Sequence, residues 1–86
     1  MYTVFNCEQT LRDSVYDSIE EFLECNADYR RFVKHGATYE RRNNDYHGCS
    51  GCQYCDDHRN MARQHNLDVI VNKQSRDIVG LLAKTP

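Results

Sequence analysis

The chain has 86 residues, a net charge of −2 and 40% hydrophobic residues, a fraction that includes six tyrosines and five cysteines. This length allows one domain, residues 1–86, with a core so small that a metal ion or a covalent cross-link would add needed stability. The apolar runs at 69–71 and 80–83 are much shorter than the roughly 20 residues that span a bilayer. We therefore expect no membrane partner.

The first residues and the cysteines indicate the compartment. The chain begins Met-Tyr-Thr-Val-Phe, without the basic and apolar stretches of a secretory signal peptide, so we expect a cytoplasmic, reducing environment. The cysteine count is odd, and three of the five lie within seven residues. Such clustering is typical of a metal site rather than of a disulfide framework.

The first predicted element is a helix over residues 6–25. Asn6 and Gln9 resemble a capping box, and Asn26 is expected to end the helix. Apolar side chains recur at intervals of three and four residues, the spacing of one helix face, at positions Cys7, Leu11, Val15, Ile19, Phe22 and Cys25. The two cysteines on this face are expected to be buried and structural.

The middle of the chain gives weaker signals. A second helix is predicted over residues 28–36, where Gly36 can adopt the left-handed conformation that closes a helix. Residues 37–48 leave two alternatives open, a short hairpin that turns at 43–45 or an irregular polar loop.

Three further elements are predicted towards the C-terminus. Residues 56–65 indicate a short helix, because acidic residues begin it and basic residues end it. The β-branched residues of 67–71 indicate a strand, which we pair with residues 2–5. Ser75 is expected to cap a closing helix whose core face is formed by Ile78, Val79, Leu81 and Leu82. The sequence therefore predicts a small, mainly helical α+β domain.

The segment 47–58 carries five side chains of the kinds that bind metal ions. They are His47, Cys49, Cys52, Cys55 and His58. Two thiolates separated by two residues can bind one ion, and the intervening Ser-Gly pair makes the turn between them easy. If a helix begins near Cys55, then Cys55 and His58 lie on its same side. We predict one structural Zn²⁺ bound by the three cysteines and His58, with His47 as the rival fourth ligand.

Other interpretations of the cysteines stay open. An iron–sulfur cluster would need a fourth cysteine, either Cys7 or Cys25. A redox dithiol formed by Cys49 and Cys52 would be expected to open a helix after a buried strand, and a loop with free thiols needs no metal at all. A catalytic zinc keeps an open position, whereas three cysteines and a histidine form a closed set. We therefore expect neither an enzyme nor a small-molecule substrate.

Charge is segregated along the chain. Residues 8–28 hold seven acidic residues and one arginine, whereas residues 29–42 hold five basic residues and one glutamate. One hypothesis is a protein partner that docks on these surfaces; the other is a nucleic acid bound by residues 29–42, where tyrosines alternate with cations. The alternative is that the opposite charges pair with each other. The predicted partner-binding residues are Glu20, Glu21, Glu24, Arg30, Arg31, Arg41 and Arg42.

One fragment resembles a known motif. Residues 47–52, His-Gly-Cys-Ser-Gly-Cys, resemble the metal motif of zinc-containing anti-sigma factors, although one residue instead of three separates His47 from Cys49. Small size and segregated charge are also typical of phage-encoded regulators. The sequence thus predicts a non-catalytic zinc-binding regulator of a partner protein, such as an inhibitor of host transcription.

Overall fold

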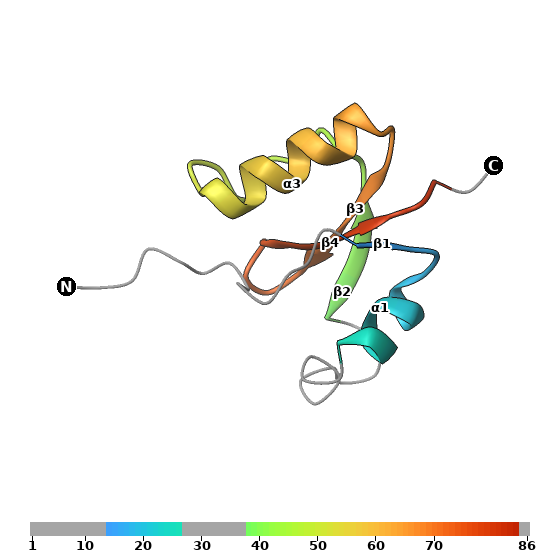
Figure 1. Cartoon of the computed structure of the whole chain (residues 1–86). Helices are drawn as coiled ribbons and strands as arrows, with labels where there is room; N and C mark the ends of the chain where they lie inside the picture. The colour runs from blue at the N-terminus through green and yellow to red at the C-terminus, as the bar shows by residue number, and fades with distance from the viewer. Residues whose placement is uncertain (1–13, 27–37, 85–86) are drawn as a thin grey trace.

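The computed structural model describes residues 14–26 and 38–84, which form a four-stranded mixed β-sheet between two helices (Figure 1). In chain order the elements are β1 (Val15–Tyr16), α1 (Ile19–Cys25), β2 (Tyr39–Arg42), α3 (Gln53–Gln64), β3 (Asp68–Asn72) and β4 (Ile78–Leu82). Helix accounts for 32% and strand for 27% of this part. The class is α+β as predicted, but the expectation of a mainly helical domain is wrong.

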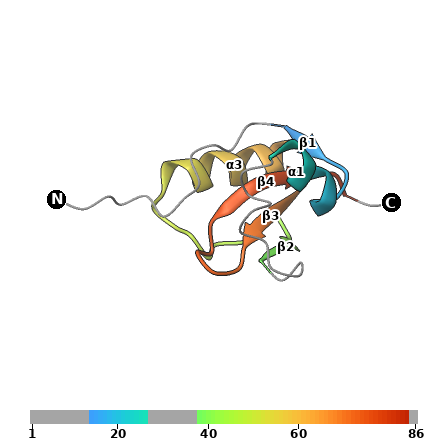
Figure 2. The same ribbon diagram turned by 90° about the horizontal axis from the view of Figure 1, so that it is seen from below.

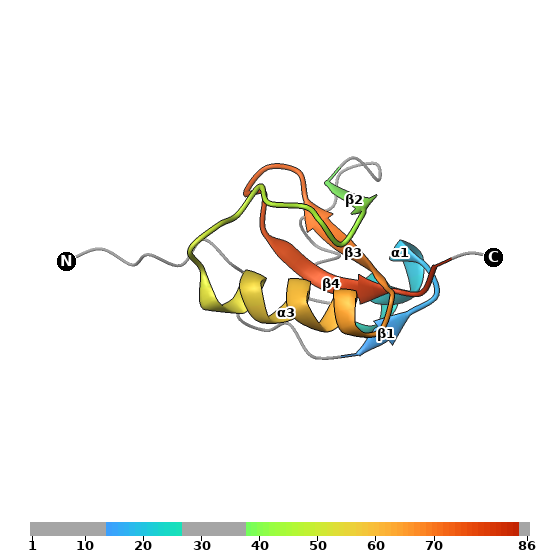
Figure 3. The same cartoon turned by 90° about the horizontal axis from the view of Figure 1, so that it is seen from above.

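The sheet has the strand order β1-β4-β3-β2. Strand β3 pairs antiparallel with both β2 and β4, and β1 pairs in parallel with β4. Helix α3 lies on one face of the sheet and α1 on the other (Figures 2 and 3). Neither of these described helices is long and apolar enough to cross a membrane.

Two apolar clusters fill the space between the sheet and its helices. In β3 the residues alternate between the two clusters, as the pleat requires, whereas in β4 a register shift opposite Ile70 and Val71 interrupts the alternation. Under α3 lie Cys55, Ala62, Val69, Val71, Ile78 and Leu81. Under α1 lie Tyr16, Phe22, Tyr39, Ile70, Val79 and Leu82.

Strand β4 occupies the place of the predicted closing helix. Every residue from Ile78 to Leu82 is buried, because helices cover both faces of the sheet at this strand. A strand buried on both faces reads as a continuous apolar run, which periodicity cannot separate from a buried helix. At Gly80, an added Cβ would lie 3.0 Å from Ile70 Cδ1 and 3.2 Å from Phe22 Cδ1. Glycine therefore lets α1 pack closely on the strand.

The first predicted helix is also corrected. Within the described residues the helix begins only at Ile19, after strand β1, and Ser18 caps it by accepting a hydrogen bond from the Glu21 N–H at 3.1 Å. The predicted stop at Asn26 is confirmed. Cys25 is exposed rather than buried. Residues 6–13, with the proposed capping box and Cys7, lie outside the described residues.

The remaining predictions have mixed outcomes. The helix at 56–65 is confirmed as α3, although it begins earlier, at Gln53, and the strand at 67–71 is confirmed as β3. Pairing of that strand with residues 2–5 is wrong, because β2 and β4 occupy both edges of β3.

The predictions for residues 28–48 are tested only in part. The helix predicted at 28–36 lies outside the described residues. No hairpin forms around 43–45, because β2 pairs with β3 and the chain then continues to α3 without a regular element. The polar-loop alternative describes residues 43–48.

Candidate metal centre

Three thiols converge where the chain enters α3. The sulfur atoms of Cys49, Cys52 and Cys55 all lie within 4.8 Å of one another. Two sulfurs that share one tetrahedral zinc ion, at about 2.3 Å each, lie about 3.8 Å apart. Small side-chain movements would therefore bring all three thiols to one ion.

Local backbone structure produces this convergence. Cys52 is the N-cap residue of α3, and its carbonyl accepts the first helical hydrogen bond from the Asp56 N–H at 2.9 Å. Cys55 follows in the first turn, and Cys49 lies in the loop just before the helix. Gly51 has a φ of +76°, a left-handed conformation that glycine adopts without strain. The Ser-Gly pair thus makes the turn that the sequence predicted.

Cys55 is the most enclosed of the three cysteines. It is fully buried, and its sulfur accepts a hydrogen bond from the Ile78 N–H on β4 at 3.4 Å. This hydrogen bond ties the Cys55 sulfur, and with it the first turn of α3, to strand β4.

Arg59 connects the cysteine loop to α3. It is only 4% exposed. Its Nε donates to the Tyr46 carbonyl and its Nη2 to the Cys49 carbonyl, both at 2.6 Å. Its Nη1 donates to Asp56 Oδ1, also at 2.6 Å. One guanidinium group therefore holds the loop at two points, one of them a cysteine of the cluster.

Sequence analysis did not single out Arg59. Its one signal was a spacing of four residues after Cys55, which places both side chains on the same helix face. Nothing in the sequence indicated that this arginine would face the loop rather than solvent.

The two candidate histidines occupy different environments. His58 is 6% exposed and lies one turn after Cys55, with Nδ1 2.6 Å from the Tyr54 carbonyl. Since a carbonyl can only accept, Nδ1 donates this hydrogen bond, as in metal-binding histidines oriented by a carbonyl. His47 is exposed, and its Nδ1 contacts the Asp45 carbonyl. Neither ring belongs to the group of converging ligand atoms, so the fourth ligand stays a prediction.

The position of Cys25 bears on the iron–sulfur alternative. It is exposed on α1, across the sheet from α3, and it is not part of the cysteine group. It does not supply the fourth thiolate that such a cluster needs. Cys7 lies outside the described residues.

The predicted partner-binding residues are dispersed. Glu20 and Glu24 are exposed on α1, and Glu21 is half-buried. Arg41 makes an ion pair with Asp68 at 2.9 Å and donates to the Ala83 carbonyl at 3.2 Å.

The alternative interpretation was that these arginines pair with the carboxylates of α1. The arginines of β2 instead pair with other residues. Arg42 lies 3.8 Å from Glu40, its neighbour on the same strand. Arg30 and Arg31 lie outside the described residues.

No family model matches the chain, and no curated protein or solved structure is significantly similar to it. The function of the chain is therefore inferred from its residues. Among the described residues, the three cysteines of this group could hold a metal ion.

Proposed function

We propose that the protein is a small, non-catalytic zinc-binding regulator, in which Cys49, Cys52, Cys55 and His58 bind one structural Zn²⁺. The convergence of three thiols within 4.8 Å carries this proposal. Soft thiolate ligands favour zinc over the hard cations that prefer oxygen. Three cysteines and a histidine leave no open position for a substrate, which supports a structural role.

The metal would fix the connection between β2 and α3. Residues 43–52 form no helix or strand, yet they carry two of the converging cysteines, Cys49 and Cys52, and the two carbonyls that accept hydrogen bonds from Arg59. In comparable peptides zinc binding contributes an apparent 10–16 kcal/mol at neutral pH. Since whole domains are stable by only about 5–15 kcal/mol, such a site would decide whether the loop and α3 stay together.

The regulator acts by binding a partner protein in the cytoplasm, where thiols remain reduced and able to bind zinc. The support is the outer face of α1, where Glu20 and Glu24 are exposed. Neither carboxylate makes an ion pair with another described residue. Host machinery that presents a basic patch, such as a transcription complex, is the class of partner that this face would suit.

Removal of the metal tests the proposed zinc site. We expect a strong chelator to lower the melting temperature measured by circular dichroism and one equivalent of Zn²⁺ to restore it. An identical melting curve with and without the chelator would contradict a structural site.

Crosslinking tests the proposed protein partner. A variant that combines Glu20→Lys with Glu24→Lys should lose the protein that the wild type captures on crosslinking. Retention of that protein would contradict the acidic surface.

A further inference from the structure

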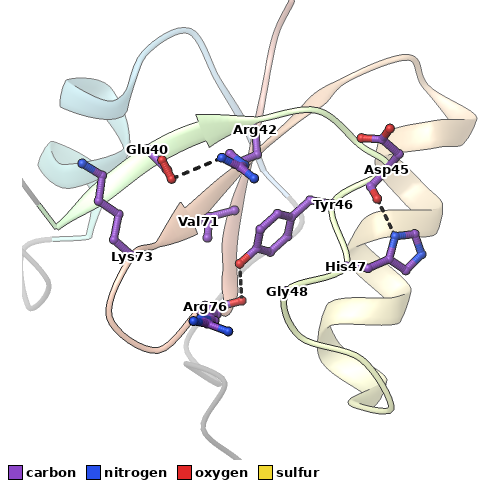
Figure 4. Close-up of a pocket in the computed structure, with 9 residues that line it drawn as sticks. All are labelled: Glu40, Arg42, Asp45, Tyr46, His47, Gly48, Val71, Lys73 and Arg76. Carbon is purple, nitrogen blue, oxygen red and sulfur yellow. Dashed lines mark hydrogen bonds and ion pairs between the residues drawn. The ribbon is translucent and has the colours of Figure 1, made fainter.

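A groove opens beside Tyr46, between the turn that joins β3 to β4 and the loop that leads to α3 (Figure 4). Its volume is about 760 Å³, within the roughly 300–1,000 Å³ of small-molecule sites. Val71 is the only aliphatic residue among the described residues that line it. The groove is therefore suited to a polar ligand larger than a single ion.

Three cations from two segments line this groove, Arg42 on β2 and Lys73 and Arg76 on the turn. Among the described residues, the ammonium of Lys73 and the guanidinium of Arg76 make no hydrogen bond or ion pair. Arg42 lies 3.8 Å from Glu40, and its side chain is 52% exposed. Such an exposed pair contributes little, so Arg42 can still contact a ligand.

Two carboxylates, Glu40 and Asp45, also line the groove, so the cations outnumber them by one. Figure 4 places Asp45 beside His47, on the opposite side of Tyr46 from Lys73. The end of the groove at the turn is therefore the cationic end.

Arg76 has an unusual backbone conformation. Its φ is +66°, in the left-handed region where glycine or asparagine is favoured over arginine. Its N–H donates to the Asn72 carbonyl at 2.7 Å, and its own carbonyl accepts from the Tyr46 hydroxyl at 3.0 Å. Strained residues cluster at binding sites, where the surrounding structure holds them in place. Here the two hydrogen bonds hold the Arg76 backbone beside the groove.

The Tyr46 side chain is held between the cations. The Arg42 guanidinium lies 5.4 Å from its ring centroid, and its hydroxyl contacts Arg76 as described. Burial raises the pKa of Tyr46 above its ordinary 10.0, although Arg42 and Arg76 act in the opposite direction. The hydroxyl therefore stays protonated and donating at neutral pH. Beneath it, Gly48 has no room for a Cβ against the Tyr46 side chain.

The groove does not end at Tyr46. An adjoining hollow of about 330 Å³ shares Arg42, Asp45 and Tyr46 with it. Both hollows therefore border the tyrosine. An aromatic ring beside several cations is a feature of single-strand nucleic-acid sites.

We propose that this groove binds the backbone of a single-stranded nucleic acid, with Arg42, Lys73 and Arg76 contacting phosphates beside Tyr46. This function goes beyond the proposed zinc-dependent regulator and does not depend on the identity of the metal. It uses β2 and the β3–β4 turn rather than the segment 29–42 alone.

The test measures fluorescence anisotropy of a labelled single-stranded oligonucleotide of about 12 nucleotides in a series of salt concentrations. The variant combines Lys73→Gln with Arg76→Asn, because asparagine tolerates a positive φ. Loss of two phosphate contacts should weaken binding at low salt at least about tenfold and reduce the slope of log K against log salt by about 1.4. Zinc content and melting temperature, measured on each variant, should stay unchanged.

The control is Lys84→Gln, which removes one positive charge, as Lys73→Gln does, at the opposite end of the β3–β4 hairpin. We expect a change of less than about twofold, since a distant charge makes no phosphate contact. Absence of binding by the wild type, unaltered affinity of the double variant, or an equal loss in the control would overturn the proposal. So would a mononucleotide or inorganic phosphate that displaces the strand at equal phosphate concentration, because the ligand would then be a small phosphate.

Discussion

Replacement of Arg59 by glutamine tests how the cysteine loop is held. The buried guanidinium donates to the carbonyls of Tyr46 and Cys49, and hydrogen bonds from a charged donor contribute about 1.5–3 kcal/mol each. The contact with Asp56, whose side chain is 46% exposed, adds at most about 1 kcal/mol. Glutamine also removes the cost of burying a charge. The net loss in the free energy of unfolding should be about 3 kcal/mol.

Urea unfolding in saturating zinc measures this loss, and competition with a chromophoric chelator measures the zinc affinity. We expect the affinity to fall about 10–100-fold, as when other groups that orient a ligand are removed. An Arg59→Lys variant should recover only part of the stability, because an ammonium cannot reach both carbonyls in the planar geometry of a guanidinium.

Arg63 provides the control one helical turn later. It is exposed, and its one side-chain hydrogen bond to another described residue runs from Nε to the Asn44 carbonyl at 3.2 Å. Arg63→Gln should therefore change the free energy of unfolding by less than about 0.5 kcal/mol. The reasoning fails if Arg59→Gln is as stable as the wild type and keeps its zinc affinity, or if the two glutamine variants are equally destabilised.

Three further experiments test the ligands and the fold. Cys55→Ser should abolish stoichiometric zinc binding in a chelator competition assay, whereas Cys25→Ser on the opposite face should bind normally; equal effects would refute the cluster. His58→Gln should lower zinc affinity by more than about 100-fold and His47→Gln only slightly, and the reverse order would assign the fourth ligand to His47. Gly80→Ala should destabilise the protein by about 1–3 kcal/mol in thermal unfolding through overpacking against α1 and β3. A gain of about 1 kcal/mol would instead indicate the helix that periodicity predicted.

The sequence predicted some elements because their local signals agreed with their surroundings. Helix α3 and strand β3 combine suitable charge order or β-branched residues with the burial they acquire. The segment at Ser18 carried a usable signal as well, since Ser18 and Glu21 have the spacing of a capping box. It was missed because the three- and four-residue spacing continued across Val15 and Tyr16, which form a strand.

Strand β4 could not be assigned locally. Its five residues are buried because α1 and α3 cover opposite faces of the sheet, and that arrangement is not visible in a short window of sequence. In the sequence, Gly80 indicated only a less stable helix. The structure shows that glycine is needed there because Phe22 packs closely against it.

In the candidate site, too, local sequence predicts some features and tertiary packing determines the others. Convergence of Cys49, Cys52 and Cys55 follows from spacing and a turn, which sequence reveals. The hydrogen bond from the Ile78 N–H to Cys55 and those from Arg59 to the loop carbonyls depend on tertiary packing. They could not be predicted from residues 47–58 alone.

Elemental analysis of the protein, purified under reducing conditions without added metal, tests the zinc site most directly. We predict one zinc ion per chain and no iron. A folded protein that contains no stoichiometric metal, or one that contains iron with the matching visible absorption, would contradict the proposed site.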